Sequence, residues 1–447
     1  MKKLIQTLKN IWSIEELKEK IIYTLLLLVV YRIGSHIVLP GVDPNGLKVL
    51  NSKAKEGLLG IFDSFAGGAF SSASIFALGI MPYISASIFM QLMTILVPQL
   101  QKLQKEGDSG RKKINQWTRY LTIIVTMFQA SAYVTYLRSA DVAGGAINPA
   151  LTSTMFWLIT TIVLTAGTMF VMWLGERITD KGLGNGTSLI IMIGILARFP
   201  ASIAAEFDAK MNRGGGGLLI FMIEIAALIA IIMGLIVLVQ GVRKIAINYA
   251  KQIVGNRQFG GARQFLPIKV NSAGVMPIIF AQAIMFLPTL LVGFNATKGI
   301  ASTLSDHGNI WYMIIYSILV IGFTFLYTAL IFNPKQIADN LKQNNGFIPG
   351  VKPGQPTADY IGSVMDKITL PGAIFLAFVG ILPGIAKNLN VSSGFSTFFG
   401  GTSLLIMVGV ILDTLQQIET HLLMRQYDGL MKGGRIQGRQ TASTTSV

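Results

Sequence analysis

Residues 64–100 read SFAGGAFSSASIFALGIMPYISASIFMQLMTILVPQL, and this stretch decides which kind of fold the chain can have. A short apolar piece, Leu58 to Phe65, stops at Gly67-Gly68, and a long apolar run follows from Ser74 to Val97. Pro82 lies inside that run and removes a backbone hydrogen bond from it. Because non-helical backbone at membrane depth is tolerated only where protein buries it or water lines it, the stretch predicts a cavity or a pore.

The composition is typical of a polytopic membrane protein. Charged residues make up 13% of the 447 residues and hydrophobic residues 52%, whereas a soluble domain has roughly a quarter charged residues. There are no cysteines, which excludes disulfides and thiolate chemistry. With three histidines and no cluster of His, Asp and Glu, the sequence predicts no metal, no cofactor and no catalytic residues.

Apolar runs predict ten transmembrane helices in an all-α fold, since most runs approach the roughly 20 residues that a bilayer requires. The runs lie near 21–38, 74–97, 120–137, 156–174, 188–205, 218–239, 273–292, 310–332, 370–385 and 403–420. Residues 1–20 carry Leu4, Leu8, Ile11 and Trp12, which predicts a cytoplasmic amphipathic segment at the membrane surface.

The distribution of Lys and Arg predicts the orientation. If the N-terminus is inside, 27 of the 37 basic residues fall in cytoplasmic segments, nine fall on the opposite side and Arg32 lies within a span. That bias places both termini, including a tail over 421–447, in the cytoplasm. It also accounts for most of the net charge of +16.

Two cytoplasmic segments, 240–272 and 333–366, are too long to be simple connectors. The first alternates apolar and polar residues around Gly260-Gly261, which predicts a two-stranded hairpin. The second carries turn signals at Pro349-Gly350 and Pro353-Gly354. Basic loops that only maintain topology are the alternative, but the length and the turns favour a docking surface for a cytoplasmic partner.

Several motifs resemble the bacterial SecY family of protein-translocation channels, and together they cover nearly the whole chain. They are GGAFSSASIFALGIMPYISASI, AGTMFVMWLGERIT, KGLGNGTSLII, VNSAGVMPIIFA, YTALIFNPKQIADNLK, IPGVKPGQPTADYI and FGGTSLLI. The resemblance implies two inverted, pseudo-symmetric halves of five helices around a central pore. The halves would be 21–205 and 218–420, joined by a hinge over 206–217.

The resemblance also implies the parts of the pore. A ring of apolar side chains would seal the waist, and a plug near 59–70 would sit outside it. A lateral gate toward lipid would form between 74–97 and 120–137 on one side and 273–292 and 310–332 on the other. The ring residues would be Ile80, Ile84, Ile191, Ile279 and Ile406; the plug residues Ile61, Phe62, Phe65, Gly67 and Gly68; and the gate residues Ser87, Gln91, Gln129 and Gln282.

Elementary physics agrees with these implied roles. A ring of isoleucines is stiff and apolar and dewets when empty. Kinks at Pro82 and Pro277 would free carbonyls beside ring positions. Gly67-Gly68 would serve as a hinge on which the plug swings.

The implied function is passage of unfolded polypeptides across the cytoplasmic (inner) membrane, with sideways release of hydrophobic segments into lipid. The chain would be the central channel subunit of the Sec translocase. The implied partners are SecE, SecG, the SecA ATPase, the ribosome, secretory precursors with signal sequences and the lipid bilayer, with SecDF and YidC as further partners. SecA and the ribosome would dock on Arg243, Lys244, Lys251, Arg257 and Lys352; at the last position relatives commonly carry an arginine.

A secondary transporter of small solutes is the alternative, since it would also combine inverted repeats with broken helices. It requires a compact set of charges at mid-membrane, and the sequence suggests none. An intramembrane enzyme would need a nucleophile with a base or a metal pair, which the sequence does not show. Glu224 and Asp413 lie in apolar runs without an assigned role, and Arg32, near a helix end, is expected to snorkel to the interface.

Overall fold

The computed structural model describes residues 12, 14–43, 63, 65–141, 147, 152–212, 217–249, 252–254, 257–259, 263–290 and 308–433. Ten long helices dominate this part of the chain, and each coincides with one of the ten apolar runs, which confirms the predicted fold class. They are α2 (Glu15–Gly34), α5 (Met81–Leu96), α7 (Asp108–Asp141), α8 (Ser153–Lys181), α9 (Gly186–Asn212), α10 (Gly217–Gln240), α11 (Met276–Leu290), α13 (Ile310–Ile331), α15 (Gln355–Asn388) and α17 (Gly401–Gly433).

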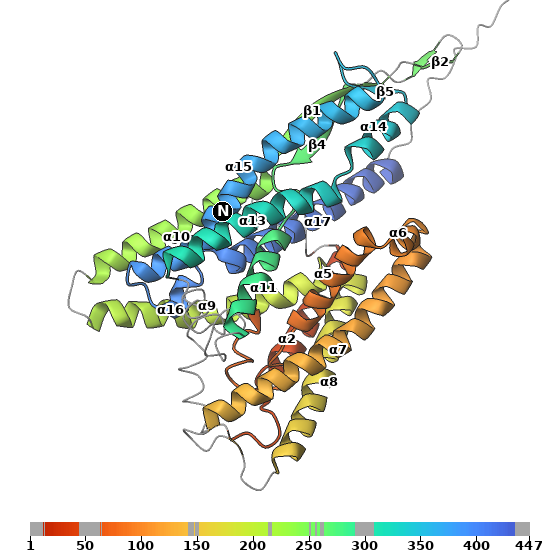
Figure 1. Ribbon diagram of the computed structural model, residues 1–447. Coiled ribbons are helices and arrows are strands. Elements are labelled where there is room, and N and C mark those ends of the chain that lie inside the picture. Colours follow the sequence, from red (N-terminus) through yellow and green to blue (C-terminus); the bar gives the residue numbers. More distant parts are fainter. Residues whose placement is uncertain are drawn as a thin grey trace, which may run out of the picture.

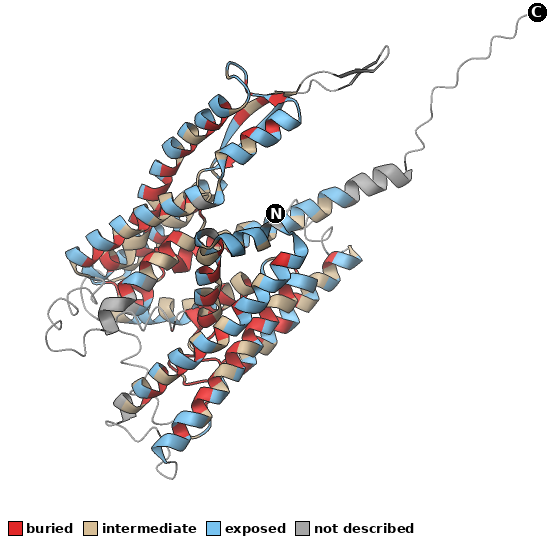
Figure 2. Cartoon of the chain, turned by 45° about the vertical axis from the view of Figure 1, so that its right-hand side comes forward, coloured by how far each residue is buried: buried red, intermediate tan, exposed pale blue. Residues whose placement is uncertain are grey.

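The chain is a multi-pass membrane protein. By length and apolar composition, seven helices in the described ranges are each able to cross a membrane. The number becomes eight if α5 and the following α6 (Pro98–Lys105), bent by 102° relative to each other, count as one span. Many residues on the outer faces of the helices are exposed (Figure 2). Apolar examples are Leu219 and Val237 of α10, which are 68% and 72% exposed. Lipid is the solvent that such faces require.

The apolar run from Ser74 to Val97 is not a single helix. Residues 66–73 and 75–80 are turns, and α5 begins only at Met81 with Ile80 as its N-cap. Pro82 therefore lies in the first helical turn, where its missing N–H breaks no hydrogen bond. Pro277 likewise is the second residue of α11. The predicted kinks at these two prolines were wrong, because each proline starts a helix instead of interrupting one.

The helices form two groups (Figure 1). One contains α2, α5, α7 and α8, and the other contains α10, α13, α15 and α17, with α11 packed on α13. Helix α9 connects the groups, since it packs on α8 and also on α10 and α17. It continues to Asn212, so residues 206–212 of the expected hinge are helical, and residues 213–216 lie outside the described part.

The two long loops predicted to be cytoplasmic form one small domain. Strand β1 (Val242–Tyr249) pairs antiparallel with β4 (Arg263–Lys269), which confirms the predicted hairpin, and β2 (Gln252–Val254) pairs with β3 (Arg257–Phe259) further along it. A strand from the second loop, β5 (Gly346–Phe347), pairs with the other edge of β1. We call this unit, with α14 (Pro334–Gln343) and the start of α15, the loop domain; Figure 1 shows it at one end of the second group.

The loop domain has its own apolar core, which explains why two loops far apart in sequence fold together. Side chains from both loops are buried in this core: Ile245, Ile247, Ile268, Leu341, Ile348, Ile361 and Met365. Burying such side chains stabilises the domain by roughly 1.5–3 kcal/mol each. The pairing of β5 with β1 was not expected, because two residues of strand leave little periodic signal in the sequence.

Candidate functional site

An apolar cluster lies where the two groups of helices meet. It contains Ile80 at the start of α5, Ile191 of α9 and Ile406 of α17, which are 4%, 7% and 6% exposed. Ile84, one turn along α5, packs against the cluster, and so does Val275, which directly precedes α11. The structure therefore brings together side chains from α5, α9 and α17.

Four of the five expected ring residues belong to this cluster or pack against it, and Ile279 does not. Ile279 is half-buried on α11, and its N–H donates to the carbonyl of Val275 at 3.3 Å. It thus lies one helical turn beyond a residue that touches the cluster.

Phe65 is the member of the cluster that comes from the expected plug. It is 6% exposed and belongs to the loop of residues 63–79, in which Ser64 is not described; we call this the 63–79 loop. Ile61 and Phe62, the other apolar plug residues, lie outside the described residues. Of the three apolar plug residues predicted from the resemblance, Phe65 is therefore the one whose contact with the cluster the structure describes.

Gly67 and Gly68 shape the 63–79 loop. Both have positive φ, +64° and +90°, a conformation that only glycine adopts without strain. Helix α9 approaches them closely: a Cβ added to Gly194 would lie 2.5 Å from the Phe65 carbonyl oxygen and 3.2 Å from the Gly67 nitrogen. The two glycines here serve a tight turn and close packing, and the predicted hinge motion stays a prediction.

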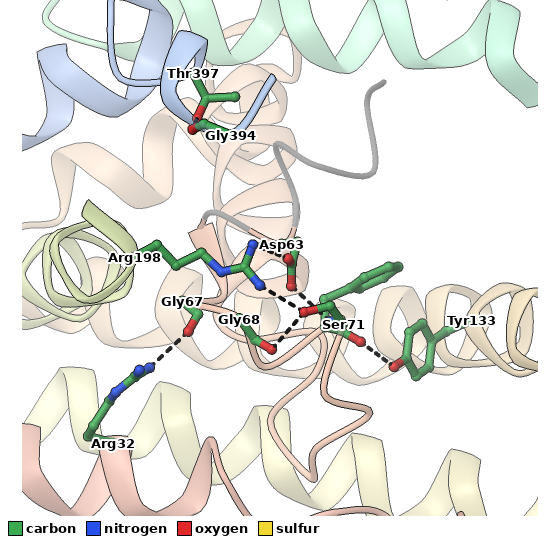
Figure 3. A network of polar contacts seen from close by, with 10 residues as sticks. Arg32, Asp63, Gly67, Gly68, Ser71, Tyr133, Arg198, Gly394 and Thr397 are labelled. Atoms are coloured by element: carbon green, nitrogen blue, oxygen red, sulfur yellow. Dashed lines mark hydrogen bonds and ion pairs between the residues drawn. The ribbon is translucent and has the colours of Figure 1, made fainter. Parts of the chain in front are cut away.

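Polar contacts hold the 63–79 loop on several sides (Figure 3). Arg32 of α2 donates to the Gly67 carbonyl at 2.8 Å, and Tyr133 of α7 donates to the Phe70 carbonyl at 2.7 Å. Arg32 therefore points inward and does not snorkel, so that expectation was wrong. The reason is that the turn presents a carbonyl within its reach, a tertiary contact 35 residues away along the chain.

Asp63 and Arg198 are functional candidates that the sequence analysis missed. The Asp63 carboxylate is fully buried and forms an ion pair with the Arg198 guanidinium of α9, which also donates to Ser71 Oγ at 2.8 Å. In the sequence, Asp63 is a single acid and Arg198 a single base within two apolar segments. The pair was passed over because Arg198 was counted among the charges of the outer side.

One contact joins the two helix groups on the side of the expected gate. Tyr327 of α13 donates to Gln91 Oε1 of α5 at 3.1 Å. Gln282 pairs instead with Thr402 of α17 at 3.3 Å, within its own group. Ser87 of α5 and Gln129 of α7 are half-buried.

A group of charges lies at the junction of α9 and α10. Lys210 Nζ lies 2.9 Å from Glu224 and 3.4 Å from Glu206, and it donates to the Asn390 carbonyl at 3.0 Å. The Ser392 N–H donates to Glu206 at 3.0 Å. The group lies where α9 ends and α10 begins, so it is not the set of mid-membrane charges that a secondary transporter would require. The sequence analysis did not predict it, because Glu206 and Lys210 meet Glu224 of the next helix only in the folded chain. Asp413, by contrast, is exposed on α17.

The described docking candidates are exposed on the loop domain. Arg243 and Lys244 lie on β1, and Lys352 precedes α15. Arg257 begins β3, but its side chain is not described, and Lys251 lies outside the described residues.

Solved structures place this fold among protein-conducting channels. The chain aligns with "The structure of a protein conducting channel" at a TM-score of 0.58, covering 94% of this chain and 95% of that chain at 16% identity. It aligns with "Sec61 in the Canine ribosome-channel complex from the endoplasmic reticulum" at a TM-score of 0.54, with the same coverage and 14% identity. At such identities the likeness concerns the fold alone.

Sequence comparison identifies the family. The SecY family model matches residues 74–415. The protein translocase subunit SecY of Streptomyces galbus is 41% identical over 439 residues, covering 93% of this chain and 97% of the relative. The corresponding protein of Chlamydia muridarum is 40% identical over 457 residues, covering 97% and 100%. The chain belongs to the SecY family.

Proposed function

We propose that this chain conducts unfolded polypeptides through a pore that is sealed at rest by the isoleucine cluster and the 63–79 loop. Its family membership gives it the role of channel subunit of a protein translocase. The observation that carries the residue-level proposal is the convergence of Ile80, Ile191 and Ile406 from both helix groups with Phe65 against them. Such a waist excludes ions, because removing their hydration shells costs far more than isoleucine contacts return.

The ring in this proposal consists of Ile80, Ile84, Ile191, Ile279 and Ile406. Ile279 is included because of the family resemblance; in the structure Val275, one helical turn before it, packs against the cluster. Isoleucine suits the role because it is apolar and branched and forms no hydrogen bond to the passing chain. Different side chains of the transported polypeptide pass the ring in turn, and a ring without polar groups binds none of them preferentially.

The lateral gate in this proposal lies between α5 and α7 on one side and α11 and α13 on the other. Two observations support this side of the molecule. Helix α9 packs on both α10 and α17, which closes the opposite side. On the gate side, a hydrogen bond between the described residues Tyr327 and Gln91 joins the two groups, and opening would break it at a cost of about 1 kcal/mol. Hydrophobic segments of a substrate would leave for lipid here.

The loop domain is the proposed docking surface for the cytoplasmic motor. It joins both basic loops into one folded unit, and it exposes Arg243, Lys244 and Lys352. Arg257 and Lys251 extend the basic surface in sequence. Positive charge on a protruding rigid unit attracts the acidic surface of an ATPase such as SecA or the RNA of a ribosome.

SecE and SecG are the proposed companion subunits, with SecDF and YidC as further partners. The proposed location is the bacterial inner membrane with both termini in the cytoplasm, which the distribution of basic residues supports. The proposed arrangement has an N-terminal half over 21–205 and a C-terminal half over 218–420. Identifying the subunits that co-purify with this chain in mild detergent tests whether the proposed companions accompany it.

A crosslink across the gate tests the proposed function. The chain has no cysteine, so Ser87→Cys with Gln282→Cys gives one defined pair, and Gln91→Cys with Tyr327→Cys gives a second pair whose native side chains touch. Joining either pair with a bifunctional maleimide is expected to block precursor import into proteoliposomes and the passage of signal sequences into lipid. Gln116→Cys with Tyr120→Cys, within α7, is the matched control. Full import through the crosslinked gate would contradict the proposal.

A further inference from the structure

The 63–79 loop is fastened to the molecule by described contacts whose partners lie on α2, α7 and α9. These are Arg32 to the Gly67 carbonyl, Tyr133 to the Phe70 carbonyl and Arg198 to Asp63 and Ser71. All three helices precede residue 213. Two further backbone bonds join the loop to residues just after α2, since Leu39 N–H donates to Ala73 and Ile75 N–H donates to Ile37.

Arg198 is the centre of this fastening. One arm of its guanidinium pairs with Asp63, and the other donates to Ser71 Oγ at 2.8 Å. Asp63 in turn accepts the Ser71 N–H at 2.8 Å, and the Ser71 hydroxyl donates to the Gly68 carbonyl at 3.2 Å. The fork of arginine is suited to bridging two such partners, whereas lysine would hold one of them.

The surroundings make the loss of either partner of this ion pair costly. Asp63 is 0% exposed and Arg198 is 23% exposed at the side chain. The guanidinium lies against Gly68, where an added Cβ would be 3.1 Å from Nε and 3.2 Å from Nη2. Losing one partner of a buried pair leaves an uncompensated charge, which destabilises the closed arrangement far more than the loss of an exposed pair does.

We infer that Arg198 is the positioning residue that holds the plug on the proposed N-terminal half, residues 21–205, through Asp63 and Ser71, independently of whether the lateral gate is open. The inference rests on the proposed function for the pore. Arg32, Tyr133 and Arg198 all belong to the proposed N-terminal half over 21–205, so a movement of that half as one body against the C-terminal half would break none of these contacts. The plug therefore leaves its seat in a second step, when an entering chain displaces Asp63 from Arg198.

The first test measures how often the plug leaves its seat at rest. Ala69→Cys places a thiol at a fully buried position of the loop, in a chain that has no other cysteine. The purified complex, with the subunits that accompany it, is reconstituted and exposed to a membrane-impermeant maleimide. Arg198→Gln is expected to raise the labelling rate of this thiol about tenfold or more.

Second-site variants separate an ion pair from a mere change of packing. Adding Asp63→Asn to Arg198→Gln removes the buried negative charge that Arg198 balanced, and it is expected to bring the labelling rate back toward that of the parent. Arg198→Lys is expected to fall between the parent and Arg198→Gln. The matched control is Arg119→Gln, which removes an exposed pair with Glu176 between α7 and α8 and should leave labelling unchanged.

The inference fails if Arg198→Gln labels at the parent rate, or if Asp63→Asn does not reverse its effect. The conductance of ring variants tests the proposed pore separately. If ring variants leak ions while Arg198→Gln leaves the labelling rate unchanged, the inference fails and the proposed pore stands.

The second test addresses the order of the two steps. Asp63→Cys with Arg198→Cys, joined by a bifunctional maleimide, fixes the plug to α9 covalently. We expect signal sequences still to photo-crosslink to gate residues while precursor import falls to background. Loss of both signals would mean that the plug must move for the gate to open. Retention of both would mean that the plug need not leave its seat, and either result would overturn the inference.

Discussion

At the scale of single residues, the ring isoleucines carry the seal. Replacing Ile191 and Ile406 together by glycine or serine is expected to make the resting channel conduct ions, because a polar or open waist stays hydrated. Planar-bilayer conductance of the purified complex measures this. Deleting residues 61–66 should add to the leak and still permit transport.

The matched control replaces isoleucines that face outward. Ile220 and Ile229 of α10 are 40% and 53% exposed, and substituting them by serine should leave conductance at the parent level. A ring variant as tight as the parent would mean that the seal lies elsewhere.

Tyr327 sets a threshold for gate opening. Tyr327→Phe removes the hydroxyl that donates to Gln91 and leaves the ring contact with Phe280 in place. Since one such hydrogen bond contributes about 1 kcal/mol, opening should become roughly fivefold more favourable.

The measurement is import of precursors with weakened signal sequences. Because gate opening limits their import, the Tyr327→Phe channel should import them severalfold faster than the parent. Tyr120→Phe removes an exposed hydroxyl that accepts from Gln116 on the same helix, and it should change nothing. Unchanged import of weak precursors by Tyr327→Phe would show that this bond does not limit opening.

At the scale of elements, the loop domain behaves as one rigid unit because β5 of one loop pairs with β1 of the other. Reversing Arg257 or Lys352 to Glu is expected to slow motor-driven import about threefold to tenfold while the channel stays folded, since like charges at an interface disfavour association. Import at a range of SecA concentrations is the measurement, and higher SecA should restore the rate.

The control is Lys113→Glu, which makes the same charge change at an exposed residue of α7 in the first helix group. Import at the parent rate by both loop variants would remove the loop domain from the proposed docking surface.

At the scale of the whole molecule, Lys210 fastens α9, the helix that connects the two groups, to α10 of the second group. It pairs with Glu206 of its own helix and with Glu224 of α10. Lys210→Met leaves two carboxylates without their cation, and we expect it to destabilise the protein by about 3–5 kcal/mol. Glu224→Gln leaves one carboxylate with one lysine and should cost much less.

Thermal unfolding of the purified complex distinguishes these variants, with a clearly lower midpoint for Lys210→Met alone. Equal midpoints for the two variants would show that charge balance at this junction does not stabilise the molecule.

The sequence by itself predicted the ten helices and the loop hairpin, and the family resemblance named four ring candidates that belong to the apolar cluster or pack against it. Long apolar runs and family motifs are local signals, and a lipid environment leaves a 20-residue apolar segment almost no alternative to a helix. The sequence misjudged Pro82 and Pro277, because a proline reads the same whether it starts a helix or interrupts one.

The tertiary structure alone decided how the charges are paired. Arg32, Arg198 and Lys210 each read as an isolated cation in the sequence, to be explained by topology or snorkelling. In the folded chain each meets a partner that other helices or a turn deliver, at Gly67, at Asp63 and at Glu224. The physical reason is that burying a charge is unfavourable unless a partner neutralises it, and that partner is set by packing distances that no local pattern encodes.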